Sequence, residues 1–221
     1  MRPAMRSPRP HERRWPATLA VLGVLTLQLV LPRQVTPGPR YLVPALELAM
    51  LVPIVVVNPL HLTRETIGLR RLGLLLVAAL AAVNVAHLAR LVVLLTSGAR
   101  QDPKVLVEAT LLIWTTNVVV AALALWETDR GGPFARDPRH RPASDRPDLL
   151  FPQLTGIPGW EPDTWRPSFV DYLFVAFTAA TTFGPADTLP LTARSKLLIG
   201  GTASVSLVTV GLVAARAVNV L

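Results

Sequence analysis

The sequence predicts an all-α fold, a polytopic transmembrane helix bundle with five or six membrane segments. Of the 221 residues, 51% are hydrophobic and the mean hydropathy is +0.45, which is more apolar than an ordinary soluble domain. The apolar residues are gathered in stretches of about 20, the length that crosses the hydrocarbon core of a bilayer. The chain has no cysteine, which excludes a disulfide framework and a thiolate metal site.

Five long apolar stretches are predicted to cross the membrane, namely 16–31, 41–60, 72–96, 105–126 and 197–220. The connections between the first four are short and contain turn residues, so these helices are expected to be antiparallel neighbours. A shorter segment, 168–183, has two open interpretations. It is either a further span or a re-entrant helix that leaves the membrane on the side where it entered.

The composition divides the chain into four regions. Residues 1–15 form a basic tail, 16–127 a four-helix transmembrane bundle, 128–166 a loop rich in Pro, Arg and Asp, and 167–221 a C-terminal helical pair. The composition of the loop predicts an exposed, partly disordered segment. Trp160 and Trp165 near its end are interpreted as interfacial anchors or, alternatively, as ligand contacts.

The charge pattern predicts the orientation. The net charge is +8 and only two of the 22 cations are lysine. Because the arginines lie between apolar runs, they indicate membrane topology and argue against a nucleic-acid partner. Five arginines in the tail place the N-terminus in the cytoplasm, four spans return the loop there, and six spans would return the C-terminus as well. Abundant Arg, Ala, Leu, Val and Pro indicates a GC-rich bacterial genome, so we expect a multi-pass protein of the bacterial plasma (inner) membrane.

Isolated polar residues inside the predicted spans form a candidate site. Counting along consecutive hairpins places Gln28, Glu47, Asn84 and Asn117 at one level near the bilayer midplane, with His87 one turn away. Polar groups at this depth are costly unless paired, and ionisable ones are functional candidates by default. Two interpretations remain open. The groups are a proton relay that includes Glu47 and His87, or they are hydrogen bonds that hold helices together.

Other features of the spans receive structural interpretations. The hairpin count brings Arg90 and Glu108 within about one turn, which predicts an ion pair. The small residues near Gly200 and Gly201 permit close helix packing. The sequence has no His-Glu-x-x-His, no Gly-rich phosphate loop and no Gly-x-Ser-x-Gly, so we expect no enzyme activity, no metal site and no cofactor.

One segment precedes the last span and resembles a known pore. It reads Thr181, Thr182, Phe183, Gly184, Pro185, Ala186 and Asp187. The order of short helix, this segment and spanning helix resembles the pore module of tetrameric potassium channels, which implies a re-entrant helix and a carbonyl-lined filter. Pro185 and Ala186 depart from the filter pattern. Proline lacks an N–H and fixes φ, and alanine avoids the positive φ that glycine adopts freely, so we expect no potassium selectivity.

A second resemblance covers nearly the whole chain. The chain is similar to an uncharacterised family of bacterial polytopic inner-membrane proteins, a domain of unknown function to which no activity is assigned. The residues that carry this resemblance are Ile113 to Thr116, Gly131-Gly132, Phe151-Pro152, Asp171 to Phe177, Thr182, Phe183, Asp187, Ala217, Asn219 and Leu221.

Together these patterns predict a channel-like or transporter-like integral membrane protein that handles an ion or proton. The alternative is a non-conducting structural or accessory membrane protein. The expected partners are the lipid bilayer and further copies of the chain, which would associate through the Thr-rich segment.

Overall fold

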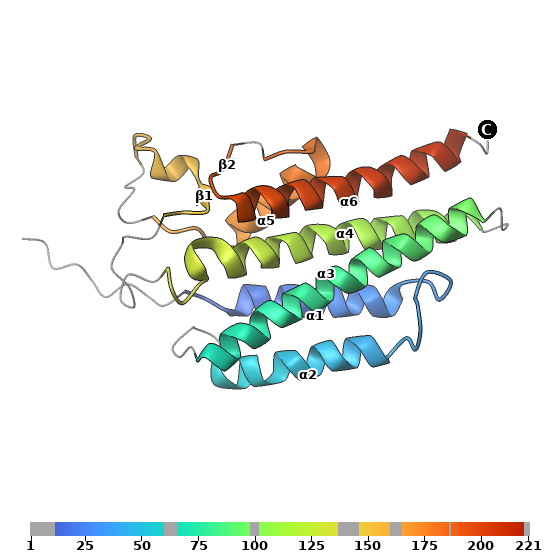
Figure 1. Ribbon diagram of the computed structural model, residues 1–221, viewed down its shortest axis with the longest axis horizontal. Coiled ribbons are helices and arrows are strands. Elements are labelled where there is room, and N and C mark those ends of the chain that lie inside the picture. Colours follow the sequence, from blue (N-terminus) through green and yellow to red (C-terminus); the bar gives the residue numbers. More distant parts are fainter. Residues whose placement is uncertain are drawn as a thin grey trace, which may run out of the picture.

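The computed structural model describes residues 12–59, 66–97, 102–136, 146–159, 165–185 and 187–218. Its helices run along one long axis and form a bundle (Figure 1). In chain order they are α1 (Trp15–Val30), α2 (Leu42–Val57), α3 (Ile67–Thr96), α4 (Pro103–Thr128), α5 (Phe169–Thr182) and α6 (Ala193–Val218). Two 3₁₀ turns, Asp129–Gly131 and Pro152–Leu154, and two short strands, β1 (Leu149–Leu150) and β2 (Leu189–Pro190), lie in the connections.

Local sequence signals explain where the helices begin. The Asp102 carboxylate accepts a hydrogen bond from the Lys104 N–H at 2.9 Å, and Pro103 occupies the first helical position of α4. The Thr66 hydroxyl caps α3 in the same way. At the start of α5, Ser168 and Asp171 form a capping box. Such caps satisfy backbone N–H groups that have no partner inside the helix.

Three helices, α3, α4 and α6, are long and apolar enough to cross a membrane. The chain is therefore compatible with a membrane protein, as predicted. The helices α1 and α2 have 16 residues each, a length of about 24 Å, which is shorter than a hydrocarbon core of about 30 Å. The five or six predicted spans are thus supported for three helices by length.

Helix α5 runs from the end of α4 into the bundle, and the chain after it returns to the end of the bundle where α5 started. Phe169 at its beginning makes an edge contact with Trp126 near the end of α4, with ring centroids 6.3 Å apart, and Phe177 contacts Trp114 in the middle of α4. Strand β2, which follows α5, pairs antiparallel with β1, which precedes it, so α6 starts where α4 ended. The chain thus comes back to the same end of the bundle before α6 begins. Both interpretations of this segment, a further span or a re-entrant helix, stay predictions.

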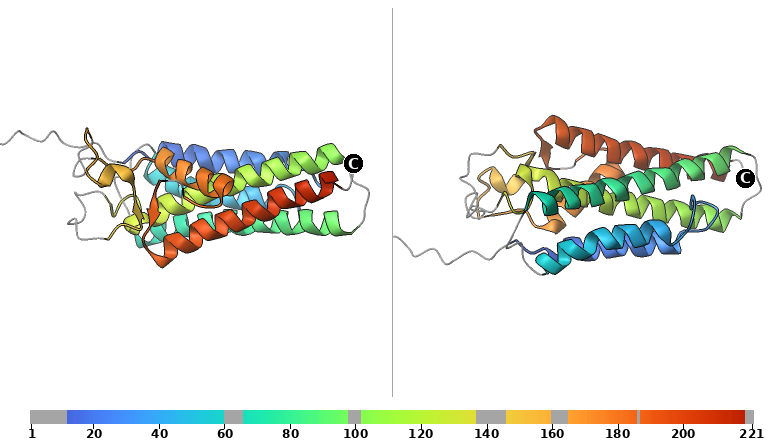
Figure 2. Two further views of the ribbon diagram at one scale, coloured as in Figure 1. Left: turned by 90° about the horizontal axis from the view of Figure 1, so that it is seen from above. Right: turned by 60° about the horizontal axis from the view of Figure 1, so that its bottom comes forward.

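The path of the chain through α5 determines the end of the bundle at which α6 begins. We call the end of the bundle at which α1 begins and α4 ends the cap end, and the opposite end the far end. Helix α6 runs from the cap end to the far end, so α1 begins and α6 ends at opposite ends of the bundle (Figure 2). The expectation that both termini are cytoplasmic stays a prediction.

Buried apolar side chains form two clusters. The larger joins α1 to α5 around fully buried groups such as Val24, Leu80, Trp126 and Tyr172, and the smaller lies towards the far end around Leu91 and Ile113. Because lipid is as apolar as these side chains, such contacts stabilise a membrane bundle mainly through close packing.

Candidate functional site: a polar cap and an inner polar layer

A dense group of polar side chains closes the cap end of the bundle. We call Glu12, Arg136, Asp129, Tyr172 and Asp148 with their hydrogen-bond partners the polar cap. Arg136 is 7% exposed and donates to both carboxylate oxygens of Glu12, from Nη2 at 2.6 Å and from Nε at 2.9 Å. The Tyr172 hydroxyl donates to Asp129 Oδ2 at 2.7 Å. These bonds connect the N-terminal segment, the end of α4 and the start of α5.

Asp148 joins α6 to the same cap. Its Oδ1 accepts from the Thr192 hydroxyl at 2.6 Å, and its Oδ2 accepts from Arg194 at 2.7 Å and from the backbone N–H of Arg130 at 2.9 Å. The Ser195 hydroxyl donates to the Asp148 carbonyl oxygen. This side chain therefore determines where α6 starts relative to the end of α4.

Electrostatics at the cap favour its charged forms. Burial raises the pKa of Asp148, but hydrogen bonds from Thr192, the Arg130 N–H and Arg194 outweigh burial, so its pKa lies below the usual value. Burial lowers the pKa of Arg136, and the neighbouring Tyr172, Glu12 and Asp129 more than compensate, so the net shift is upward. The carboxylates and the guanidinium thus stabilise one another.

The cap corrects in part the prediction that residues 128–166 form an exposed loop. Asp129, Arg136, Asp148, Leu149 and Phe151 are buried, whereas residues 155–159 are exposed as predicted. The polar groups of the buried residues are paired, and Phe151 packs edge-on against Tyr172 at 5.6 Å. Composition alone could not indicate this, because the partners of these charges lie far away in the sequence. Trp160 lies outside the described residues, and Trp165 packs against Phe151.

Gly132, next to the polar cap, is a position where the backbone requires glycine. Its φ is +99°, a conformation that favours glycine, and a Cβ atom there would overlap the Arg70 guanidinium. Arg70 in turn donates to Glu127 Oε2 at 3.1 Å and to the Glu127 carbonyl oxygen at 2.6 Å. The Gly131-Gly132 pair therefore makes room for a bond between α3 and α4.

Inside the bundle, Gln28, Glu47 and Asn84 form what we call the inner polar layer. Glu47 is 2% exposed, and Gln28 and Asn84 are nearly as buried. The Gln28 side chain is the polar neighbour of the Glu47 carboxyl. No hydrogen bond of normal length reaches either oxygen of Glu47, either polar atom of the Gln28 amide, or Asn84 Oδ1. The three side chains come from α1, α2 and α3.

The register of the helices places Glu47 and Asn84 close together along the bundle axis. A pocket groups Leu51 and Ile54 of α2 with Leu76 and Val77 of α3. Glu47 lies four to seven residues from the former pair, and Asn84 lies seven to eight residues from the latter. At about 1.5 Å per residue, Glu47 and Asn84 are within about one helical turn along the bundle axis. The hairpin count made from sequence had placed them at one level.

The other two predicted members of the layer behave differently. Asn117 donates to the Thr202 carbonyl oxygen at 3.0 Å and to the Ser206 hydroxyl at 2.9 Å, so it joins α4 to α6. His87 is buried on α3 with 5% exposure. The five predicted groups therefore divide into an inner layer between α1, α2 and α3, the buried His87, and a satisfied α4–α6 contact at Asn117.

The predicted ion pair between Arg90 and Glu108 is not formed. Both residues are described and exposed, and Arg90 instead donates from Nε to the Gln34 carbonyl oxygen at 3.3 Å. Hairpin counting gives the height of a residue on its helix but not the direction in which it points. The two side chains can therefore share a level without facing each other.

The pore-like segment lies on the outside of this chain. Thr181, Thr182 and Phe183 are exposed, and Gly184 and Pro185 are half-buried. Helix α5 ends at Thr182, and Phe183 follows with a left-handed φ of 60°. The Thr182 hydroxyl donates to the Gly184 carbonyl oxygen at 2.8 Å. Asp187 is exposed, and Ala186 lies outside the described residues.

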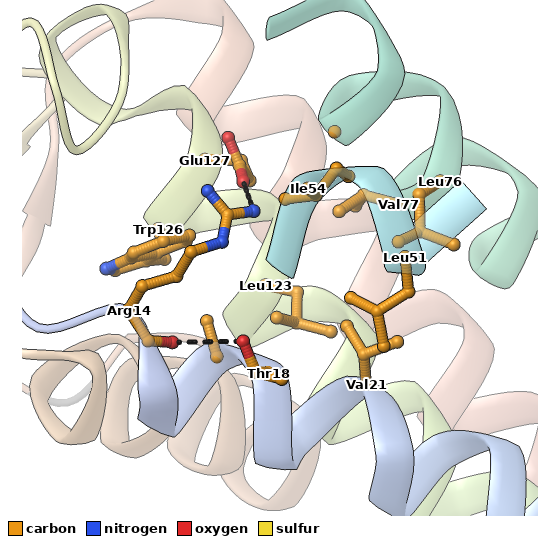
Figure 3. A pocket seen from close by; sticks show the side chains of 12 residues that line it. Arg14, Thr18, Val21, Leu51, Ile54, Leu76, Val77, Leu123, Trp126 and Glu127 are labelled. Carbon is orange, nitrogen blue, oxygen red and sulfur yellow. Dashed lines mark hydrogen bonds and ion pairs between the residues drawn. The ribbon is translucent and has the colours of Figure 1, made fainter. Parts of the chain in front are cut away.

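A small pocket lies between α1, α2, α3 and α4 at the cap end (Figure 3). Its cavity is about 20 Å³, which is room for about one water molecule. Arg14 and Glu127 lie at one side of it, with Arg14 Nη2 3.9 Å from Glu127 Oε1, and Val21 and Leu51 lie at the other. The pocket thus has a charged mouth and an apolar floor.

Comparison with known proteins finds no matching family model, no matching curated protein and no matching solved structure. Within the described ranges, no group of three or more His, Asp and Glu side chains is placed to hold a metal ion. The inner polar layer and the pocket at the cap end are the candidate sites in the described part of the chain.

Proposed function

We propose that this chain is an integral membrane protein of channel-like or transporter-like type that moves protons or small monovalent cations, with Glu47 as the binding group. One observation carries the proposal: the Glu47 carboxyl is buried, and its polar neighbour Gln28 makes no hydrogen bond of normal geometry to either of its oxygens. Buried polar groups without partners are rare in folded proteins. An ionised carboxylate in such a place is stable only when a proton or a cation neutralises it.

The neighbours of Glu47 support this proposal. The amide of Gln28 and the Oδ1 atom of Asn84 supply further oxygens from two other helices. Amide and carboxylate oxygens can solvate a bound proton, a water molecule or a small cation. The other interpretation is that these groups hold the helices together. It requires them to form hydrogen bonds with one another, as Asn117 does with Thr202 and Ser206. Asn117 is the observation that favours the alternative of a non-conducting structural or accessory protein.

We propose that α1 to α4 and α6 cross the membrane and that α5 is re-entrant from the cap end. Cations are concentrated at that end, which favours a cytoplasmic location. The described ones are Arg13, Arg14, Arg70, Arg71, Arg130, Arg136, Arg146, Arg166, Arg194 and Lys196. In vesicles a membrane-impermeant thiol reagent should label Thr155→Cys from the cytoplasmic side and Gln34→Cys from the other side. The opposite pattern would reverse the proposed orientation.

We also propose that copies of the chain associate over the α5 face. Helix α5 is about 21 Å long, so its end and the irregular residues after it lie at membrane depth. Exposed irregular backbone is not tolerated against lipid, but only inside protein or along water. Gly201→Leu on the exposed face of α6 should weaken association, whereas Gly23→Leu on α1 should not. Neither glycine has an atom of another residue within 4 Å of its ideal Cβ, so both variants fit within one copy.

The test of the main proposal is flux. In liposomes that hold the purified protein and a pH indicator, an imposed gradient should drive proton or cation movement. Glu47→Gln should remove that movement, because the amide cannot exchange a proton or neutralise a cation. Glu108→Gln makes the same chemical change at an exposed position of α4 and should leave the flux unchanged. Absence of flux in the wild type, or full flux in Glu47→Gln, would contradict the proposal.

We propose that the transported ion is not selected as in a potassium channel. Pro185 lacks an N–H and has a restricted φ, so the segment after α5 is unsuited to a ladder of inward carbonyl groups. A potassium-selective current from the wild-type protein would contradict this part.

A further inference from the structure

The pocket at the cap end lies on the same interior seam as the inner polar layer. On α2, Ile54 and Leu51 line the pocket and Glu47 continues the same face. On α1, Ala17 and Val21 line it and Gln28 continues that face. Positions three, four and seven apart share one side of a helix. Both helices therefore lead from the pocket to the layer.

The pocket and the layer are separated by a thin apolar barrier. Leu51 at the floor is one helical turn from Glu47, a distance of about 6 Å along the axis. Val24 and Leu80 lie between the two levels and are 0% exposed. A small rearrangement of these apolar side chains would bring water from the pocket to the Glu47 carboxyl.

The size of the pocket favours protons over metal cations. Arg14 and Arg70 both lie beside Glu127, so charged side chains, which hydrogen-bond water readily, lie at the mouth. The cavity of about 20 Å³ holds about one water molecule, which is too little for a hydrated cation. Protons, which move along water molecules, are not subject to this size limit.

We propose that this pocket is the proton entry to Glu47 from the cap end, with Val24, Leu51 and Leu80 as its gate. The inference rests on the proposed function and narrows it, since it selects protons over metal cations and assigns a route. Protons pass from water in the pocket to the Glu47 carboxyl when the gate opens. Gln28 and Asn84 orient the water that reaches the carboxyl.

Water access can be measured without flux. The chain has no cysteine, so a single cysteine reports one position through the infrared S–H band, which shifts when the thiol exchanges in D₂O. The full-length protein in bilayers is used with Leu51→Cys at the pocket floor and Val52→Cys as the matched control. Val52 is the next residue of α2 and is 50% exposed on the outer surface of the bundle, whereas Leu51 is 4% exposed inside it.

We expect the Leu51→Cys thiol to exchange roughly tenfold faster than that of Val52→Cys, because local opening admits water only on the pocket side. Adding Gly73→Leu, which fills the pocket, should remove this difference. Gly73→Ala is the milder variant, since its Cβ would lie 3.4 Å from Glu127 Oε1, an ordinary contact. It should slow the exchange partially.

Equal exchange at the two positions, or exchange at Leu51→Cys that neither Gly73 variant slows, would overturn the entry route. Proton flux with no exchange at Leu51→Cys would overturn the route but leave the proposed function. Exchange without any flux would support the route to Glu47 and contradict the proposed function. Flux of a metal cation through the wild type would overturn the selection of protons.

Discussion

The polar cap and the inner polar layer differ in the hydrogen bonding of their carboxyl groups. At the cap, every carboxylate oxygen of Glu12, Asp129 and Asp148 accepts a hydrogen bond. In the inner layer, Glu47 is as buried as Asp129 and Asp148, and its neighbour Gln28 makes no hydrogen bond of normal geometry to either of its oxygens. We interpret the polar groups of the cap as stabilising the fold and those of the inner layer as available to bind a proton or cation. A satisfied network rigidifies a fold, whereas an unsatisfied one lowers stability and persists where function requires it.

The comparison predicts its largest effect at Arg136. Arg136→Met removes the guanidinium that bridges Glu12, the Trp126 carbonyl and the Asp129 carbonyl. The free energy of unfolding should fall by about 3–5 kcal/mol, because the loss leaves the Glu12 charge without its partner. Denaturation in detergent measures the change. Arg33→Met at an exposed position of the far end should change the stability by less than about 0.5 kcal/mol. A similar small loss for both variants would show that the cap is not the stabilising region.

Asp148 should give a smaller effect with a defined pH dependence. Asp148→Asn disturbs the bonds to Thr192, Arg194 and the Arg130 N–H and should cost about 1–3 kcal/mol at neutral pH. Because the pKa of Asp148 is lowered in the folded state, its contribution is fully present above the usual aspartate pKa. It is lost as the pH falls through the lowered value.

Denaturation as a function of pH checks this sign. The stability difference between wild type and Asp148→Asn should be constant near neutral pH and should shrink on acidification below the usual aspartate pKa. A difference that instead grows towards acidic pH would show that the carboxyl of Asp148 is not stabilised in its charged form.

The smallest effect on stability is expected at Glu47. Glu47→Leu replaces an unbonded carboxyl with an apolar side chain of similar size, so the stability should stay within about 1 kcal/mol of the wild type or increase. The same denaturation assay applies. A loss comparable to that of Arg136→Met would show that Glu47 is part of a structural network, and the distinction between the two regions would fail.

The helices and the height of the inner layer were predictable because both follow from local periodicity. Apolar stretches, turn residues and caps mark the helices, and hairpin counting places Glu47 beside Asn84. The direction in which a side chain points on its helix was not predictable. Arg90 and Glu108 share a level but do not meet, and Asn117 bonds α6, because tertiary packing determines the rotation of each helix.

The cap was missed for a different reason. Glu12 and Arg136 are 124 residues apart in the chain, and no local pattern links them. The composition of residues 128–166 is typical of an exposed loop, and only partners from four other segments allow its charges to be buried. The Gly131-Gly132 pair is the sequence feature in that region that indicates a turn. Both glycines have a positive φ, and the Arg70 guanidinium that leaves no room for a Cβ at Gly132 lies in another helix.

The central claim is that Glu47 binds and releases a proton inside the bundle. Infrared difference spectroscopy on the protein in bilayers tests this most directly, by following the carbonyl band of a protonated carboxyl while the external pH is changed. The account predicts a band typical of a carboxyl without strong hydrogen bonds, which changes with pH and is absent in Glu47→Gln but present in Glu108→Gln. A band that is unaffected by pH, or that persists in Glu47→Gln, would contradict the claim.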